Sequence, residues 1–451
     1  MSTTEIIQIA ITTLGGIALL LYGMNVLGSG LEKISGGKME KILEKLTNNI
    51  FKAVILGALV TAVIQSSSAT TVIVVGLVNS GILTLSAAVG IIMGANIGTT
   101  ITGQILRLGD LENNQSLGTA MEFITPTYLA PMLAIIGIII ILIAKKDSIR
   151  AVGDIGMGLG ILFTGMLSLT DAVKPLSELE AFRNLFASLE NPILGILAGT
   201  VVTALIQSSS ASIGILQAVS ATGVLKFAAA FPIIMGQNIG TCSTSILSSV
   251  GASKNAKRTA MVHFYFNFIG TVLFLICVYI LKALDLIPMW NDTMDMGSIA
   301  NFHTLFNIIV TVVFIHFHKV LEKLAIMTIR SKPEDEDEIA VDSAENMLDS
   351  RFLKSPSLAI QYASNAVSYM GKLARENYKM SCELHFSYDT KHAERIREYE
   401  EIIDRTEDRL NSYLVSITDC ELSVAESRSV TSLLHIITDF ERIGDYAFNI
   451  M

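Results

Sequence analysis

The sequence predicts an all-α membrane protein in which two related halves, each with a re-entrant helical hairpin, are followed by a cytoplasmic helical bundle. Three observations lead to this prediction. Of the 451 residues, 51% are hydrophobic and only 16% are charged, a balance that favours lipid over water as the solvent. Charged residues are dense only after residue 330, so a soluble part follows a membrane part. A long stretch of the first half also recurs in the second half.

Seven apolar segments reach the length of about 20 residues that a helix needs to cross a bilayer. Two more apolar stretches, 53–80 and 195–222, are interrupted by Gln-Ser-Ser-Ser. Irregular backbone at membrane depth survives only where protein or water surrounds it, so we interpret both as re-entrant hairpins. One long kinked span in each place is the alternative. The predicted spans are 6–28, 84–108, 119–144, 151–172, 226–250, 259–284 and 299–327.

The charges of the loops predict how the chain is oriented in the membrane. Basic loops follow the first, third, fifth and seventh spans, and the loops between them are acidic. Because cytoplasmic loops are enriched in Lys and Arg, the N-terminus is expected outside and the C-terminal part in the cytoplasm of a multi-pass protein of the cell membrane. The lysines and arginines of the first three basic loops are Lys33, Lys38, Lys41, Lys45, Lys52, Lys145, Lys146, Arg150, Lys254, Lys257 and Arg258.

An internal repeat relates the two halves of the membrane part. Residues 59–100 recur without a gap as residues 201–242, so that Gln65 matches Gln207. Each copy holds three spans and one hairpin, and an odd number of crossings inverts the second copy, as in many secondary transporters. The sequence thus predicts a transmembrane domain over 1–330, with repeat 1 at about 6–144, repeat 2 at about 151–284 and an extra span at about 299–327.

The two Gln-Ser-Ser-Ser motifs are candidates for binding an anion. A helix that restarts at such a motif exposes backbone N–H groups and the positive end of its dipole, and serine hydroxyls add donors. Packing between membrane helices is the common alternative role of serine, but three consecutive hydroxyls duplicated after Gln exceed what packing needs. The predicted substrate-binding residues are Gln65, Ser66, Ser67, Ser68, Gln207, Ser208, Ser209 and Ser210.

A second matched pair of motifs is a candidate for binding a hard cation. Asn-Ile-Gly-Thr occurs inside one predicted span of each repeat, and amide, hydroxyl and carbonyl oxygens suit sodium. No Lys or Arg lies near these motifs, so a bound anion would need co-bound cations for neutralisation, which is a physical reason for coupling. The predicted ligands are Asn96, Thr99, Thr100, Asn238 and Thr241.

The duplicated Gln-Ser-Ser-Ser and Gly-x-Asn-Ile-Gly-Thr motifs, in a repeat across residues 14–284, resemble the type II sodium/phosphate cotransporter family, in its bacterial branch. The resemblance implies an inverted-repeat symporter that takes up inorganic phosphate with sodium by alternating access around a midplane site. It also implies sodium ligands around the turns, which adds Ser68, Thr70 and Ser210 to the cation set. One departure is Glu122, which would bind a cation or lie solvated or paired at a span end.

The C-terminal part resembles a PhoU domain, a regulator of phosphate transport and signalling. An acidic linker over 331–352 precedes a bundle over 353–451, in which helices are expected at 355–386, 390–416 and 421–451. With the resemblance, carboxylates one helical turn apart become candidates to share a metal between helices, the alternative being a solvated helix face. These candidates are Glu400, Asp404, Glu441 and Asp445. The end of the chain at Met451, within a helical pattern, suggests a truncated bundle.

Other functions are weighed against phosphate uptake. A phosphate exporter, a phosphate-sensing membrane protein and a transporter of another small oxyanion all fit the same donors. A primary pump is disfavoured because no Gly-rich phosphate loop occurs, and an enzyme because the histidines near the span ends have no nucleophile at a recognisable spacing. The expected partners are phosphate, sodium and the lipid bilayer, with no nucleic acid; assembly into a homo-oligomer is left open.

Overall fold

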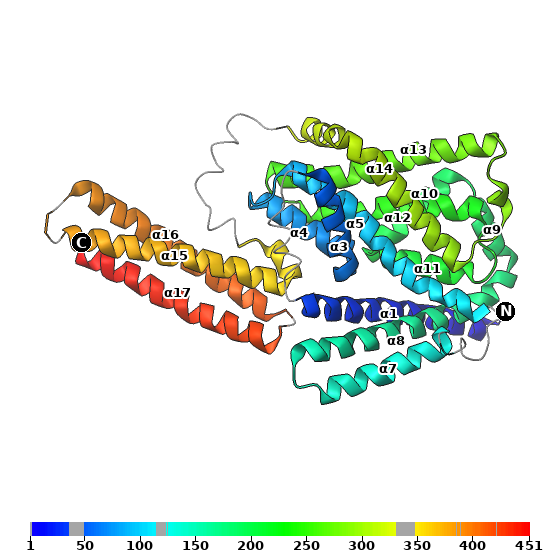
Figure 1. Ribbon diagram of the computed structural model, residues 1–451, viewed down its shortest axis with the longest axis horizontal. Helices are drawn as coiled ribbons and strands as arrows, with labels where there is room; N and C mark the ends of the chain where they lie inside the picture. The colour runs from blue at the N-terminus through cyan, green and yellow to red at the C-terminus, as the bar shows by residue number, and fades with distance from the viewer. Residues whose placement is uncertain are drawn as a thin grey trace. The chain divides into compact units, whose positions relative to one another are not determined.

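The computed structural model is all-helical over the residues that it describes, which are 2–35, 49–113, 123, 125–330, 348–384, 386–387, 389–420 and 422–451 (Figure 1). Within these ranges the helical fold class predicted from the sequence is confirmed. The contacts divide the chain into two compact units. The membrane unit comprises Met1–Val75 and Thr84–Ile329, and the bundle unit comprises Gly76–Leu83 and Arg330–Met451. Glu122, the loop residues Lys38, Lys41 and Lys45, and linker residues 331–347 lie outside the described residues.

Of the α-helices that the structure describes, twelve begin in the membrane unit, and α4 spans residues of both units. Short 3₁₀ segments connect some of them: η1 (Arg107–Asn113), η2 (Lys174–Glu178) and η3 (Pro288–Asn291). The helices are α1 (Thr3–Ser35), α3 (Ile50–Ile64), α4 (Ser67–Asn79), α5 (Leu85–Leu106), α7 (Pro126–Ile143), α8 (Asp147–Val173), α9 (Glu180–Ser188), α10 (Pro192–Ile206), α11 (Ser209–Ser220), α12 (Phe227–Ser248), α13 (Lys254–Ala283) and α14 (Met296–Thr328).

Among the described residues, six helices rather than the expected seven are long and apolar enough to cross a membrane: α1, α5, α7, α8, α13 and α14. The expected span at 226–250 does form a helix, α12, but it is not one of the six. Gln237, Asn238 and Ser245 of α12 are buried. These polar residues lower the mean hydropathy of the helix, and they are tolerated because protein surrounds them. Counting the bent pair α9 and α10 as one span, with its 104° bend, gives up to seven.

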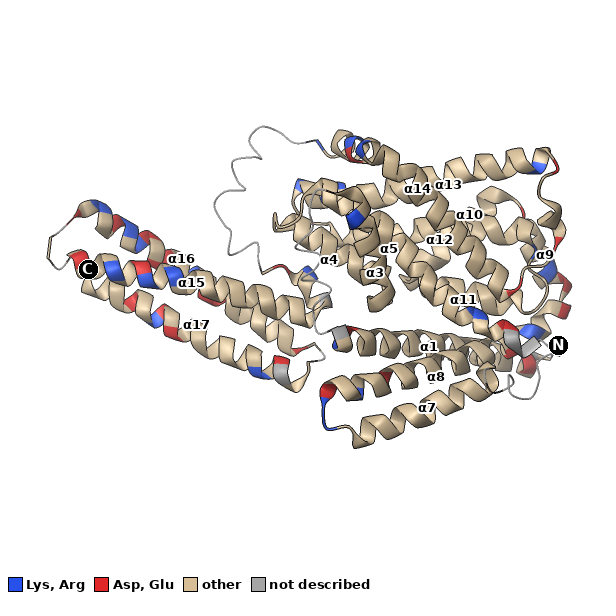
Figure 2. Cartoon of the chain, viewed as in Figure 1, with Lys and Arg blue, Asp and Glu red and all other residues tan. Residues whose placement is uncertain are grey.

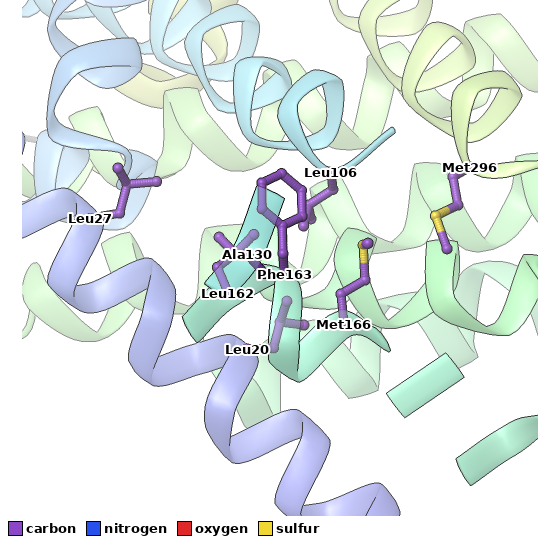
Figure 3. Packing of buried hydrophobic residues seen from close by; sticks show 8 residues of the cluster. All are labelled: Leu20, Leu27, Leu106, Ala130, Leu162, Phe163, Met166 and Met296. Carbon is purple, nitrogen blue, oxygen red and sulfur yellow. The ribbon is translucent and has the colours of Figure 1, made fainter. Parts of the chain in front are cut away.

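Glycines allow α1 and α8 to pack closely, and they do so in matched pairs. A Cβ at Gly23 would collide with the backbone of Leu162, and a Cβ at Gly165 would collide with the backbone of Leu20. Gly165 lies 142 positions after Gly23, and Leu162 lies 142 positions after Leu20. The offset between Gln65 and Gln207 is the same. Figure 3 shows the cluster that α1 and α8 build with their neighbours. Its buried members are Leu20, Leu27, Leu106, Ala130, Leu162, Phe163, Met166 and Met296.

Charged residues in the membrane unit gather at the ends of its long helices, and the ribbon between these ends is almost free of them (Figure 2). At one such end, Lys33 Nζ of α1 lies 3.4 Å from Asp154 Oδ2 of α8. This is the distribution that a bilayer imposes, because a charge is least costly where a helix leaves the hydrocarbon. It agrees with a membrane location for this unit.

In the described part of the bundle unit there are three long helices, α15 (Pro356–Leu384), α16 (Thr390–Thr418) and α17 (Val424–Ile450), each in contact with the other two. Apolar residues on their inner faces are buried, including Met370, Ile403 and Leu414. A short 3₁₀ helix, η7 (Ser350–Lys354), comes before them. The segment Gly76–Leu83 belongs to the same unit, and within it Asn79 Nδ2 donates to Asp349 Oδ2 at 2.8 Å.

Candidate functional site

Both Gln-Ser-Ser-Ser motifs break a helix in the same way. Gln65, after the last residue of α3, has φ of 57°, and Gln207, after the last residue of α10, has φ of 58°. The backbone N–H of each donates to the carbonyl of a threonine one turn earlier, at 2.8 and 2.7 Å. A side-chain-bearing residue in the left-handed region costs about 1 to 3 kcal/mol, so surrounding structure must hold both breaks in place. The sequence predicted these breaks.

The first serine of each motif caps the helix that follows. Ser66 Oγ accepts from Ala69 N at 3.1 Å, and Ser208 Oγ accepts from Ala211 N at 3.2 Å. This is the usual role of serine at a helix N-terminus. The next serines, Ser67 and Ser209, are buried, with 7% and 3% of their surface exposed. The first serines therefore shape each break.

The structure brings the two breaks together. Ser68 Oγ of α4 donates to the backbone carbonyl of Gln207 at 3.2 Å, across 139 positions of sequence. The first break is also held by α5, because Thr102 Oγ1 donates to Gln65 Oε1 at 2.9 Å. The substrate-binding residues predicted from sequence thus come from two breaks that touch each other. Neither break contains a basic side chain, so any donors come from N–H and O–H groups.

The predicted cation ligands of the Asn-Ile-Gly-Thr motifs are buried within α5 and α12. The hydroxyls of Thr99, Thr100 and Thr241 donate to carbonyls of their own helix at 2.8 to 3.0 Å, which leaves oxygen lone pairs to accept from a ligand or to bind a cation. Asn96 Nδ2 likewise donates to Ile92 O at 2.9 Å.

The other predicted cation ligands make different contacts. Asn238 Oδ1 lies 3.3 Å from His303 Nε2 of α14. Thr70 Oγ1 donates to Ser66 O at 3.0 Å, inside the first break. The hydrogen bonds described for these ligands do not join α5 or α12 to either break, so the set is divided between the breaks and these two helices.

Sequence reasoning missed two buried glutamines that connect the second repeat to its surroundings. Gln217 Nε2 of α11 donates to Gly103 O at 3.0 Å and to Met296 O at 2.9 Å. Gln237 Nε2 of α12 donates to Ser212 O at 3.0 Å. Their counterparts 142 positions earlier are Val75 and Ala95. Comparison of the repeats therefore gave no signal for either glutamine.

A cluster of carboxylates lies between α16 and α17 of the bundle unit. Oxygens of Glu400, Asp404 and Asp445 all lie within 4.8 Å of one another. Partial burial, followed by repulsion from neighbouring carboxylates, raises the pKa of Glu400 and of Asp404. Glu441, the fourth predicted ligand, is not grouped with them, although burial and Asp445 raise its pKa as well. An all-oxygen set suits a hard divalent cation.

We expect that removing one charge from this cluster will distinguish the effect of carboxylate repulsion on stability from the effect of a bound metal. Carboxyl pKa values raised by folding mean that the folded state binds protons more tightly, so the cluster's contribution to stability falls as pH rises above about 4. At pH 7 without metal, Asp445→Asn should therefore slow amide exchange in α16 and α17. In the wild type Mn²⁺ should slow this exchange, and in the variant it should do so much less.

Hydrogen exchange read by mass spectrometry measures both effects in the intact chain. The exposed Asp439 on the same helix offers a matched control, and Asp439→Asn should respond to Mn²⁺ as the wild type does. An Asp445→Asn protein that still responds fully to Mn²⁺ would remove the carboxylates from consideration as a metal site.

Comparison with known proteins agrees with these features. A model of the Na⁺/Pi-cotransporter family matches residues 19–171 and 164–287, and a PhoU domain model matches residues 367–451. No solved structure matches the chain.

Among similar proteins, one of Salmonella typhimurium, provisionally named inorganic phosphate export protein YjbB, is 25% identical over 436 residues, covering 96% of this chain and 75% of its own. Its Escherichia coli K12 counterpart is 25% identical over 439 residues, with the same coverage. Human sodium-dependent phosphate transport protein 2B is 41% identical over 101 residues, which are 22% of this chain and 14% of its own. From the family match over more than half of its length, the chain belongs to the Na⁺/Pi-cotransporter family and carries a PhoU domain.

Proposed function

We propose that this chain is a sodium-coupled transporter of inorganic phosphate that works by alternating access around the two Gln-Ser-Ser-Ser breaks. The observation that carries the proposal is the contact between the breaks, in which Ser68 Oγ donates to Gln207 O at 3.2 Å. Two helices, α4 and α11, begin at this contact. Their first N–H groups and the hydroxyls of Ser67 and Ser209 can donate to a tetrahedral anion from two sides.

Coupling to sodium follows from the charges of the site. A phosphate ion bound there would meet no Lys or Arg in either break, and an unneutralised anion at membrane depth is costly. Sodium ions bound by hydroxyl and amide oxygens of Ser68, Thr70, Asn96, Asn238 and their neighbours would supply the missing charge. Neither ion would then bind well without the other, which is the thermodynamic basis of symport.

The inverted relation of the two halves is supported by the packing of α1 against α8. The helices are antiparallel, because Gly16 faces Leu169 whereas Gly30 faces Ala151 and Ile155. Gly23 of the first half packs on Leu162 of the second, and the equivalent residues with the halves exchanged, Gly165 and Leu20, make the same contact. A local twofold axis between the two helices would produce this exchange. An axis that relates two antiparallel spanning helices lies in the membrane plane. The expected orientation, with the N-terminus outside and the PhoU domain in the cytoplasm, rests on the charges of the loops.

Purified protein in liposomes tests the proposal directly. Uptake of labelled phosphate should require an inward sodium gradient and should fall to the level of empty liposomes when potassium replaces sodium. Excess sulfate should not compete with labelled phosphate for uptake. Competition by sulfate would point to a broader class of oxyanion substrates. Full uptake in potassium with a proton gradient would overturn the sodium assignment.

Export is the second candidate, because the Salmonella and Escherichia coli relatives, which align across both domains, are provisionally named inorganic phosphate export proteins. A symporter runs in the direction set by its combined ion gradients. The same liposomes loaded with phosphate distinguish the two directions. Efflux against an inward sodium gradient would favour export, whereas sodium-driven accumulation would favour uptake.

A further inference from the structure

The two Gln-Ser-Ser-Ser breaks have the same backbone geometry but different side-chain contacts. Gln65 and Gln207 have nearly equal φ angles, and a serine caps the following helix in the same way at each break. The nearby motif threonines also match, since Thr99 of α5 and Thr241 of α12 each donate to the carbonyl four residues earlier, at 2.9 and 3.0 Å. The differences lie in side chains that reach from one helix to another.

Side chains hold the first break in place. Thr102 Oγ1 of α5 donates to Gln65 Oε1 at 2.9 Å, and Gln65 Nε2 donates to Ala62 O. Thr61 Oγ1 of α3 donates to Thr70 Oγ1 of α4 at 3.1 Å, which joins the two helices of the hairpin. Both ends of the Gln65 amide therefore take part in hydrogen bonds.

The second break lacks these contacts, although it has residues that could make them. The positions 142 residues later hold Gln207, Thr244, Thr203 and Ser212, so the amide and all three hydroxyls are retained. The Gln207 residue is exposed. The hydroxyl oxygens of Thr203, Ser212 and Thr244 are buried, and none has a hydrogen-bond partner among the described residues. A buried hydroxyl without a partner is costly, so this half holds donors whose partners are out of reach.

Helix α1 shows the same difference between the halves. A Cβ at Gly28 of α1 would lie 3.1 Å from Ile64 O and 3.9 Å from Gln65 Cβ, so α1 packs against the end of α3. The counterpart of Gly28 is Thr170 of α8. The Thr170 hydroxyl oxygen is also buried and unpartnered within the described ranges. Helix α8 contacts α11, the helix that follows the second break.

One repeated sequence thus has two arrangements of contacts, one in each half. If the halves exchanged roles, Thr244 would donate to Gln207 and Thr203 to Ser212, and Thr170 would lie at the end of α10. The equivalent bonds of the first half would break. Because this exchange replaces contacts by others of the same kind, the two arrangements would be close in free energy, which is the condition for a two-state element.

We propose that Thr102 and Thr244 are positioning residues that hold Gln65 and Gln207 in turn. In the arrangement described here the first latch, Thr102 with Gln65, is closed and Gln207 is released. In the exchanged arrangement the second latch, Thr244 with Gln207, closes and Gln65 is released. The proposal rests on the proposed function, because alternating access needs two such states, and it adds which hydrogen bond stabilises each of them.

Two pairs of cysteines report the two arrangements through disulfide formation. Gly28→Cys with Gln65→Cys should form a disulfide in the described arrangement, because Cβ atoms 3.9 Å apart suit such a bond. The equivalent pair, Thr170→Cys with Gln207→Cys, should form one in the exchanged arrangement. The full chain is oxidised in detergent without sodium or phosphate, and mass spectrometry of linked peptides gives the rate at which each disulfide forms.

Removal of the first latch should favour the exchanged arrangement. Thr102→Val conserves shape but removes the hydroxyl, and the loss of one neutral hydrogen bond shifts an equilibrium roughly two- to tenfold. The disulfide between positions 170 and 207 should therefore form faster by this factor. Thr244→Val is the matched control in the same chain, because its partner Gln207 is already replaced, and it should leave the rate unchanged.

A role of Thr102 in packing alone makes a different prediction. The disulfide between positions 170 and 207 would then form no faster in Thr102→Val, and this result would overturn the proposal. So would the absence of that disulfide in a chain whose positions 28 and 65 do link, since the asymmetry would then be fixed. If Thr102→Val aggregates, Gln65→Met, which removes the acceptor of the same bond, should speed the same disulfide, and an unchanged rate would again overturn the proposal. Failure of the proposed function is distinct, because it is read from sodium-driven phosphate uptake by the wild type.

Discussion

Ser67→Ala and Ser209→Ala should each weaken phosphate binding about tenfold or more, measured by isothermal titration in saturating sodium. Both serines are buried at the breaks that the Ser68–Gln207 contact joins. A hydrogen bond to a charged group contributes about 1.5 to 3 kcal/mol, and about 1.4 kcal/mol corresponds to a factor of ten in affinity. A loss of affinity from both substitutions would indicate that the two breaks act in one binding event.

The double variant tests whether the two hydroxyls share one ligand. If they do, the combined loss should be smaller than the sum of the single losses, because the ligand readjusts once either hydroxyl is gone. Ser220→Ala is the control, since Ser220 is a buried serine on α11 that donates to Gln217 O at 2.7 Å, away from the break. Strict additivity, or full affinity after alteration of one break, would contradict a shared site.

Gly94→Ala and Gly236→Ala should each destabilise the membrane unit and reduce phosphate binding with it. A Cβ at Gly94 would collide with the carbonyl of Val54 in α3, and a Cβ at Gly236 with the carbonyl of Ile196 in α10. Backbone cannot rotate away as a flexible side chain can, so the helix pairs must separate, at a cost of about 1 to 3 kcal/mol or more. Because α3 and α10 end at the breaks, their displacement should move the binding groups.

Thermal unfolding of purified protein in detergent measures this loss of stability. Gly15→Ala is the control, because a Cβ at Gly15 of α1 would have no atom within 4 Å apart from its own turn of helix. Its melting temperature should be unchanged or slightly higher, since alanine favours a helix over glycine by up to about 1 kcal/mol. Equal melting temperatures for all three variants would show that close packing of α3 on α5 and of α10 on α12 contributes little.

Much of the membrane unit could be predicted because its causes are local in sequence. Spans follow from runs of apolar residues, and the breaks follow from polar motifs within such runs, so the α3–α4 and α10–α11 breaks were expected at the residues where they occur. The predicted span at 226–250 was less secure because its character depends on its surroundings. The residues of α12 are polar where neighbouring helices cover them, and a count of apolar residues cannot see that cover.

What the sequence by itself determined is the membrane class, the positions of the helices, the repeat, and the motifs by which the phosphate transporter family and the PhoU domain were recognised. Tertiary structure alone decided which polar groups meet. The contact of Ser68 with Gln207 and the hydrogen bonds of Gln217 depend on helix packing between residues far apart in the chain. Such packing is set by the shapes of whole helix faces, and no local pattern encodes it.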